Sequence, residues 1–235
     1  MRTSLVALAA AGVLAGCATN TLPPTIQTGP NAEVTVDGLH RVDNSLVQMA
    51  WMKPDMDLRG YTALMLDPVF VAYQKDPQDR RRAEQVGAGD PNFALSPTQM
   101  ENLKSWFHEA VVEAFSRDGA YRITTTPGPD VLRISADLLD LVVRVPTERT
   151  GGRSTTFTRT FGEVTLVVEV RDSESGEILA RAGDRRDPRS MEGTSMTEVS
   201  PTFVKADTQR LFRYWADIMR DRLDELRGVE RDPGQ

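Results

Sequence analysis

The sequence predicts an α+β fold: a mainly antiparallel or mixed sheet of about five strands, with two helices packed on one face as a two-layer sandwich. Two observations lead to this prediction. Two segments carry apolar residues at helical spacing, and more strand-like segments surround them than two helices could connect in parallel. Because antiparallel strands need only tight turns between them, a surplus of strands favours antiparallel pairing.

The first main strand is expected over residues 61–73, a near-continuous apolar run typical of a strand covered on both faces. Pro68 interrupts this run, and proline has no N–H group to donate to the ladder. We therefore expect a bulge or bend at Asp67 and Pro68. A long polar loop is expected to follow over residues 74–95.

The first helix has the clearest start and stop signals in the chain. Ser96 is expected to be its N-cap, Pro97 its first residue, and Gln99 the partner in a capping box. Gly119 supplies the C-terminal stop. The predicted apolar face consists of Met100, Leu103, Phe107, Ala110, Val111 and Ala114.

A short strand is expected at 121–125 and, after a turn at 127–130, a long strand at 131–145. The apolar residues of the long strand occupy one parity up to Leu138 and the other parity from Leu139 onward. Because a slip of one residue turns every side chain to the opposite face, we expect a bulge near these two leucines.

Apolar and polar residues then alternate over 164–170, and a turn at 172–176 leads to a return strand at 177–184. The final helix is predicted to end at Gly228. Its apolar stripe consists of Val204, Leu211, Trp215, Ile218, Met219, Leu223 and Leu226. Burial of Phe107 in the first helix and of Trp215 in the last is expected.

The first residues have the features of a signal peptide. Arg2 forms the positive n-region, and residues 5–16 form an uncharged apolar run that is shorter than the roughly 20 residues of a membrane span. The run ends in Leu14-Ala15-Gly16-Cys17, which resembles the lipobox of bacterial lipoproteins. This resemblance implies cleavage before Cys17 and lipidation of its sulfur. Cys17 is the single cysteine of the chain, so it has no partner for an internal disulfide.

The predicted organisation is a signal peptide at 1–16, a lipidated N-terminus with a flexible linker at 17–33, and a single periplasmic α+β domain at 34–235. Residues 34–60 are expected to form an irregular arm, because their apolar positions follow no sustained period. Two or more acyl chains anchor a protein stably in a membrane. Ala18, not Asp, follows the cysteine, which by resemblance to Gram-negative sorting favours the periplasmic side of the outer membrane.

The charge balance argues against a nucleic-acid partner. The full chain has 28 basic and 34 acidic side chains, and removal of the signal peptide takes Arg2 away and leaves a net charge of −7. General nucleic-acid binding rests on phosphate neutralisation by many Lys and Arg side chains. The expected partners are therefore the membrane, through Cys17, and an envelope protein or an anionic envelope polymer.

Residues for catalysis or metal binding are scarce. Both histidines, His40 and His108, are expected to be solvated. His108-Glu109 begins like a zinc-protease motif, but Val112 occupies the position of the second histidine. A pair of carboxylates from separate strands would not be visible in the sequence. We predict no catalytic residue, no metal ligand and no cofactor.

One basic segment departs from the acidic average. Arg149, Arg153 and Arg159 lie in a polar excursion between strands, and further arginines follow at positions 181, 185, 186 and 189. If these loops share one end of the sheet, their guanidinium groups would suit phosphate or carboxylate. The alternative is a solvated hairpin tip, since polar loops commonly have no ligand. Arg149, Arg153 and Arg159 are the candidate anion contacts.

Three segments together resemble a family of bacterial lipoproteins known only as a domain of unknown function. They are Leu58-Arg59-Gly60-Tyr61 with Leu64-Met65-Leu66-Asp67-Pro68-Val69, Gly128-Pro129-Asp130-Val131-Leu132-Arg133, and the stretch from Arg171 to Ala180. The resemblance spans most of the mature chain. It implies secretion, lipidation and one α+β domain, and it implies no activity.

Three functions are compatible with these observations. The leading hypothesis is a non-enzymatic lipoprotein of the envelope that acts as a binding or assembly module. The alternative is a carrier or transport accessory that shelters an apolar ligand between sheet and helices. A hydrolase with scattered carboxylates is the third.

Overall fold

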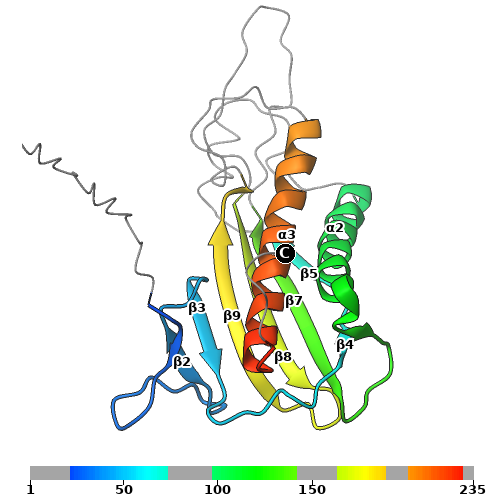
Figure 1. The fold of residues 1–235 in the computed structure, drawn as a ribbon. Coiled ribbons are helices and arrows are strands. Elements are labelled where there is room, and N and C mark those ends of the chain that lie inside the picture. Colours follow the sequence, from blue (N-terminus) through cyan, green and yellow to red (C-terminus); the bar gives the residue numbers. More distant parts are fainter. Residues whose placement is uncertain (1–21, 74–96, 142–162, 189–200, 230–235) are drawn as a thin grey trace, which may run out of the picture.

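Two helices lie on the same face of a nine-stranded mixed sheet and contact each other (Figure 1). The computed structural model describes residues 22–73, 97–141, 163–188 and 201–229. The helices are α2 (Pro97–Ser116) and α3 (Pro201–Leu226), and a short 3-10 turn, η1 (Arg117–Gly119), follows α2. The strands are β1 (Thr25–Ile26), β2 (His40–Asp43), β3 (Met49–Met52), β4 (Ala63–Leu66), β5 (Phe70–Tyr73), β6 (Arg122–Ile123), β7 (Val131–Leu141), β8 (Val164–Asp172) and β9 (Ile178–Arg186).

The strand order is β1-β2-β3-β9-β8-β7-β4-β6, with β5 also paired to β7. Strands β7, β8 and β9 form an antiparallel meander, whereas β4 and β5 run parallel to β7, and β6 runs parallel to β4. The predicted α+β class and the two helices on one face are confirmed. The prediction of about five strands is wrong, because the sheet has nine.

The additional strands come mostly from the N-terminal segment. Residues 34–60, expected to be an irregular arm, contain β2 and β3, and β3 pairs with β9 from Met49↔Gly183 to Met52↔Ala180. Residues 25 and 26, in the expected linker, form β1 against β2. These strands are too short to show an alternation in the sequence, and β3 is held by a partner more than 120 residues away.

Pro68 divides the first main strand, as predicted. Strand β4 pairs with β7 from Ala63↔Val131 to Leu66↔Ile134, and β5 resumes at Phe70↔Asp137 with one extra residue in the connection. The N–H group of Asp67 still donates to the carbonyl of Ile134, at 2.9 Å. Pro68 therefore lies where the ladder requires no donor.

The predicted bulge near Leu138 and Leu139 is present in the pairing with β5, because β7 has one more residue than β5 between Val71↔Leu138 and Tyr73↔Leu141. It is absent from the pairing with β8, where the register runs without a shift through Leu138↔Leu166 and Leu139↔Thr165. Leu139 therefore points to the face away from the helices. The expectation assumed that this second face would be polar, but it also holds apolar side chains.

The core lies between the sheet and the two helices. Both predicted anchors are buried: Phe107 of α2 is 2% exposed and Trp215 of α3 is 1% exposed. Phe212 joins them, edge-on to Phe107 with ring centroids 5.3 Å apart and stacked on Trp215 at 6.1 Å. Opposite them are the inward residues of the central strands, Leu132, Ile134, Ala136, Leu138, Val164, Leu166 and Val168.

The helix ends follow the predicted signals where the structure describes them. Pro97 is the first residue of α2, while Ser96 lies outside the described residues. Gly119, with φ of 65°, ends the turn after α2. Gly228, with φ of 73°, ends α3, where its N–H donates to Glu225 at 3.0 Å and the Val229 N–H donates to Asp224 at 2.9 Å. This pair of bonds is a Schellman motif, which favours glycine.

A buried ion pair holds the last turns of α3 against the end of α2. The Nε of Arg220 donates to Asp224 at 2.6 Å, and its Nη1 donates to the Ala114 carbonyl at 2.7 Å. Both charged side chains are almost fully buried. Arg220 therefore also satisfies a carbonyl that the end of α2 leaves without an intrahelical donor.

Candidate functional site on the outer face of the sheet

The face of the sheet opposite α2 and α3, here called the outer face, carries most of the polar chemistry. Strand alternation sends Leu132, Ile134 and Ala136 toward the helices and the residues between them outward. The outward residues of the meander are Arg133, Ser135, Asp137 and Leu139 of β7, Thr165, Val167, Glu169 and Arg171 of β8, and Arg181, Gly183 and Arg185 of β9.

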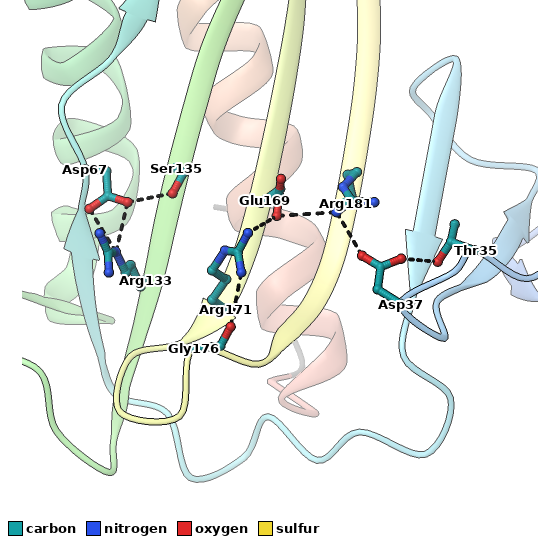
Figure 2. A network of polar contacts seen from close by, with 9 residues as sticks. All are labelled: Thr35, Asp37, Asp67, Arg133, Ser135, Glu169, Arg171, Gly176 and Arg181. Atoms are coloured by element: carbon teal, nitrogen blue, oxygen red, sulfur yellow. Dashed lines mark hydrogen bonds and ion pairs between the residues drawn. The ribbon is translucent and has the colours of Figure 1, made fainter.

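At one side of the outer face, Asp67 is held by two side chains of β7. The Nε of Arg133 donates to both carboxylate oxygens at 2.9 Å, and the hydroxyl of Ser135 donates to Oδ2 at 2.6 Å (Figure 2). Burial raises the pKa of Asp67, but the hydrogen bonds from Arg133 and Ser135 outweigh it and leave the pKa lowered. Asp67 is therefore a fixed anion with its partners already in place.

The centre of the outer face holds a second, self-compensating group. Glu169 Oε2 lies 2.6 Å from Nη2 of Arg171 and 3.5 Å from Nη2 of Arg181. Arg171 also donates to the Gly176 carbonyl at 3.1 Å, and Arg181 donates to Asp37 at 2.9 Å (Figure 2). Asp37 in turn accepts the hydroxyl of Thr35. Each carboxylate of this group is thus bonded to at least one guanidinium.

A different row of residues lies on the outer face two residues further along the strands from Glu169 and Arg181. Phe70, Asp137, Val167, Gly183 and Met49 are successive partners across β5, β7, β8, β9 and β3. We call these five residues the apolar row. Phe70 is 58% exposed and Met49 is 51% exposed. Large apolar side chains exposed at both ends of one row distinguish it from its charged neighbours.

Asp137 is the single charged member of the apolar row. Within the described residues it makes no hydrogen bond and no ion pair, although it is partly buried. Burial raises its pKa, and the negative charge of Glu169 raises it further. A carboxylate in this position is less stable in its charged form than one paired with a cation.

The candidate site residues predicted from the sequence, Cys17 and Arg149, Arg153 and Arg159, all lie outside the described residues. The nearby arginines that the structure describes are paired with carboxylates. Arg185 Nη2 lies 2.5 Å from Glu163, and Arg186 Nε lies 2.6 Å from Asp184. These two arginines therefore form no open guanidinium rim.

Of the two histidines, His108 is exposed on α2, as expected. His40 differs from the expectation. It is partly buried, and its Nδ1 lies 2.8 Å from the carbonyl of Gln27, a contact that joins β2 to the segment after β1. Across the described ranges, no three His, Cys, Asp or Glu side chains are grouped to hold a metal ion. In the same ranges no helix combines the length and apolarity needed to cross a membrane.

Asp67, Asp137 and Glu169 were not among the site residues predicted from the sequence. The available signal for Asp137 was its place in a strand, at the parity opposite to the inward leucines. Nothing in the sequence showed that Asp67 and Glu169 have arginine partners while Asp137 has none in the part of the chain that the structure describes.

A family model described as "Protein of unknown function (DUF3313)" matches residues 35–219. The chain belongs to the DUF3313 family. This confirms the resemblance to a domain of unknown function, and the DUF3313 match includes β2 to β9 and most of α3. No curated protein matches the chain.

Several solved structures are distantly similar to this DUF3313 protein. PelC from Paraburkholderia phytofirmans, described as a dodecamer, is 11% identical, with 73% of this chain and 95% of that chain covered and a TM-score of 0.34. The hypothetical protein CT253 from Chlamydia trachomatis is 13% identical, with coverages of 70% and 99% and a TM-score of 0.37. A neuraminyllactose-binding hemagglutinin homolog from Helicobacter pylori is 7% identical, with coverages of 74% and 91% and a TM-score of 0.35. These values are too low to carry an inference about function.

Proposed function

We propose that this DUF3313 protein is a lipid-anchored protein of the bacterial envelope that acts as a non-enzymatic binding or assembly module. Cys17, at the end of an apolar run and a lipobox-like sequence, is the observation that carries the anchor. Ala18 supports placement at the outer membrane, facing the periplasm.

The outer face supports binding over catalysis. Asp67 and Glu169 already accept hydrogen bonds from arginines, so neither is available as a general base or nucleophile. Among the described residues, Asp137 is unpaired and has no hydroxyl, thiol or imidazole beside it as a hydrogen-bond partner. A surface that combines exposed apolar groups with such a carboxylate is suited to association with another molecule.

The packing of the core supports surface binding over the carrier alternative. Phe107, Phe212 and Trp215 fill the layer between sheet and helices with aromatic rings in contact. An apolar ligand in this layer would have to displace them. We therefore place binding on the outer face, with an envelope protein as the partner. An anionic envelope polymer, held through Arg149, Arg153 and Arg159, is the alternative partner.

The anchor is tested by Cys17→Ser in the full chain expressed in its own host. We expect the variant to lose the acyl mass on its N-terminal peptide and to move from the membrane to the soluble fraction, while Ala18→Ser, which keeps the cysteine, stays in the membrane. Ala18→Asp should shift the protein to the inner membrane. A wild-type protein that stays on the membrane without any acyl mass would contradict the proposal.

A further inference from the structure

We propose that the apolar row is the docking surface for a segment of a partner protein that presents a Lys or Arg side chain between apolar side chains, with the cation paired to Asp137. This inference rests on the proposed function only in placing the partner in the envelope. The docking surface consists of Phe70, Asp137, Val167, Gly183 and Met49.

The first reason is the position of Asp137. It is flanked by β5 on one side and β8 on the other, so strand alternation fixes its side chain on the outer face. It has no partner within the described residues, and Glu169, on the neighbouring strand, disfavours its charge. An incoming cation would relieve both the incomplete solvation and the repulsion.

The second reason is that the nearby charges are already balanced. Glu169 is shared by Arg171 and Arg181, and Asp67 is held by Arg133. A cation that approaches the outer face therefore gains most at Asp137. An anionic group would meet an uncompensated carboxylate there, so the surface selects against it.

The third reason is the apolar surroundings of Asp137. Phe70, its direct partner on β5, is 58% exposed, so a Lys or Arg paired with Asp137 would lie beside an aromatic ring that also attracts cations. Met49 ends the row and lies over Gly183, where an added Cβ would stand 3.5 Å from the Met49 methyl. Four strand spacings separate Phe70 from Met49, about 19 Å, which is the length of about six extended residues.

A second copy of this chain is a poor occupant. In a twofold dimer through this row, the same patch would face itself, and the Asp137 of one copy would approach the negatively charged patch of the other. The mature chain also carries a net charge of −7, which favours a cationic partner over a second copy.

The test uses the full lipidated protein in its native envelope, with a photo-crosslinking phenylalanine analogue at Phe70. The control carries the analogue at His108, which is exposed on α2, the opposite layer. We expect crosslinking to one partner at position 70 at least about tenfold above position 108, with a Lys or Arg in the crosslinked peptide. Asp137→Lys should reduce the crosslink about tenfold, and exchange of the partner's cation for Glu should restore it.

Glu113→Lys, a matched charge reversal on the exposed face of α2, should leave the crosslink unchanged, and equal melting temperatures would show that both variants fold. Asp137→Asn, which keeps the shape of the side chain, should reduce the crosslink less than Asp137→Lys does. Crosslinks to a second copy, to no protein, or to a partner peptide without a cation would each overturn the inference, as would a crosslink that Asp137→Lys leaves intact. Because lipidation is read separately from the acyl mass on Cys17, failure of the anchor and failure of the docking surface are distinguishable.

Discussion

Trp215 of α3 donates its indole N–H to the buried carboxylate of Asp184 on β9, at 2.8 Å. Asp184 is 3% exposed and also accepts from Arg186 at 2.6 Å and from the backbone N–H of Gln48 at 3.1 Å. One carboxylate thus connects the last helix, the meander and the turn before β3. Because a buried carboxylate needs several donors, all three contacts hold Asp184 in place, and the bond from Trp215 connects α3 to the sheet.

Trp215→Ala should lower the free energy of unfolding by about 3–5 kcal/mol, because it leaves a large cavity and removes one donor from Asp184. Trp215→Phe, which retains most of the ring, should cost less. Urea denaturation measures the free energy of unfolding of both variants, provided that the m value is unchanged. Trp106→Phe, at a partly buried tryptophan on α2, is the control. A near-neutral Trp215→Ala would mean that the core does not depend on this contact.

Arg220→Met should destabilise the fold by about 3–5 kcal/mol, because it deprives Asp224 of its arginine and the Ala114 carbonyl of its donor. The double variant Arg220→Met with Asp224→Leu should recover much of this loss, since neither charge of this pair then remains buried. Thermal unfolding of the two variants gives the comparison. Equal melting temperatures for the single and double variants would show that the buried charge is not the source of the loss.

The hydrogen bond between Tyr61 and Asp172 should make the stability of the fold depend on pH at both ends of the pH range. The hydroxyl of Tyr61 donates to Asp172 at 2.9 Å, and burial, then this hydrogen bond, raises the pKa of Tyr61 to about 12. Because the unfolded chain ionises its tyrosines near pH 10, this contribution to stability is complete below pH 10 and declines between about pH 10 and 12. The hydrogen bonds from Ser175 and Tyr61 lower the pKa of Asp172, so its contribution is lost as the pH falls below about 4.

Tyr61→Phe should reduce the amplitude of the high-pH tyrosinate step in a spectrophotometric titration by one tyrosine and cost about 0.5–1.5 kcal/mol at neutral pH. Burial also raises the pKa of Tyr121, so part of this step should remain in the variant. A high-pH step of unchanged amplitude in Tyr61→Phe would contradict the raised pKa of Tyr61.

Asp137→Asn should stabilise the isolated protein while weakening the proposed docking. The raised pKa of Asp137, due to burial and to Glu169, means that the folded state holds its proton more tightly than the unfolded state. Its carboxylate therefore costs stability as the pH rises above the unfolded value near 4. We expect the melting temperature of Asp137→Asn to exceed that of the wild type by roughly 1–3 °C at pH 7, a shift of the size that a sub-kcal effect gives in a domain of this length.

The difference in melting temperature between the wild type and Asp137→Asn should disappear below pH 4, where both side chains are neutral. Ser135→Ala, in the same strand and on the same face, should instead lower the stability, because Ser135 donates to Asp67. A lower melting temperature for Asp137→Asn at neutral pH would show that the carboxylate has a partner in the folded protein.

Features with a local physical cause were predictable from the sequence. Proline at position 68 divides β4 from β5, Pro97 begins α2 and Gly228 ends α3, each because a single residue restricts the backbone. Strands β2 and β3 were not predictable, because each has only four residues and β3 depends on β9, more than 120 residues away, for its partner. The bulge predicted at Leu138 and Leu139 affects only the pairing with β5, and Leu139 keeps its register with β8 because the outer face is not uniformly polar.

The candidate site was harder to predict from the sequence than the fold. Carboxylates and arginines are visible in the sequence, but their pairing depends on which strands are neighbours. Asp67 meets Arg133 only because β4 lies beside β7 in parallel, and Arg181 meets Asp37 only because β3 pairs with β9. The lack of a partner for Asp137 within the described ranges is a result of these pairings, so it could not be recognised before them.

The edge formed by β1, β2 and β3 also has a mechanical consequence. β1 is bonded to the sheet through β2, β2 through β3, and β3 through β9, so a pull on the chain before β1 loads these strands in succession. Loss of β1 and β2 leaves the pairing of β3 with β9 in place, whereas release of β3 breaks that pairing and the bond from Gln48 to Asp184. Release of residues 22–52 would extend the chain by on the order of 100 Å, at about 3.3–3.6 Å per residue. A pull on the chain before β1 would therefore lengthen the N-terminal segment strand by strand, beginning with β1.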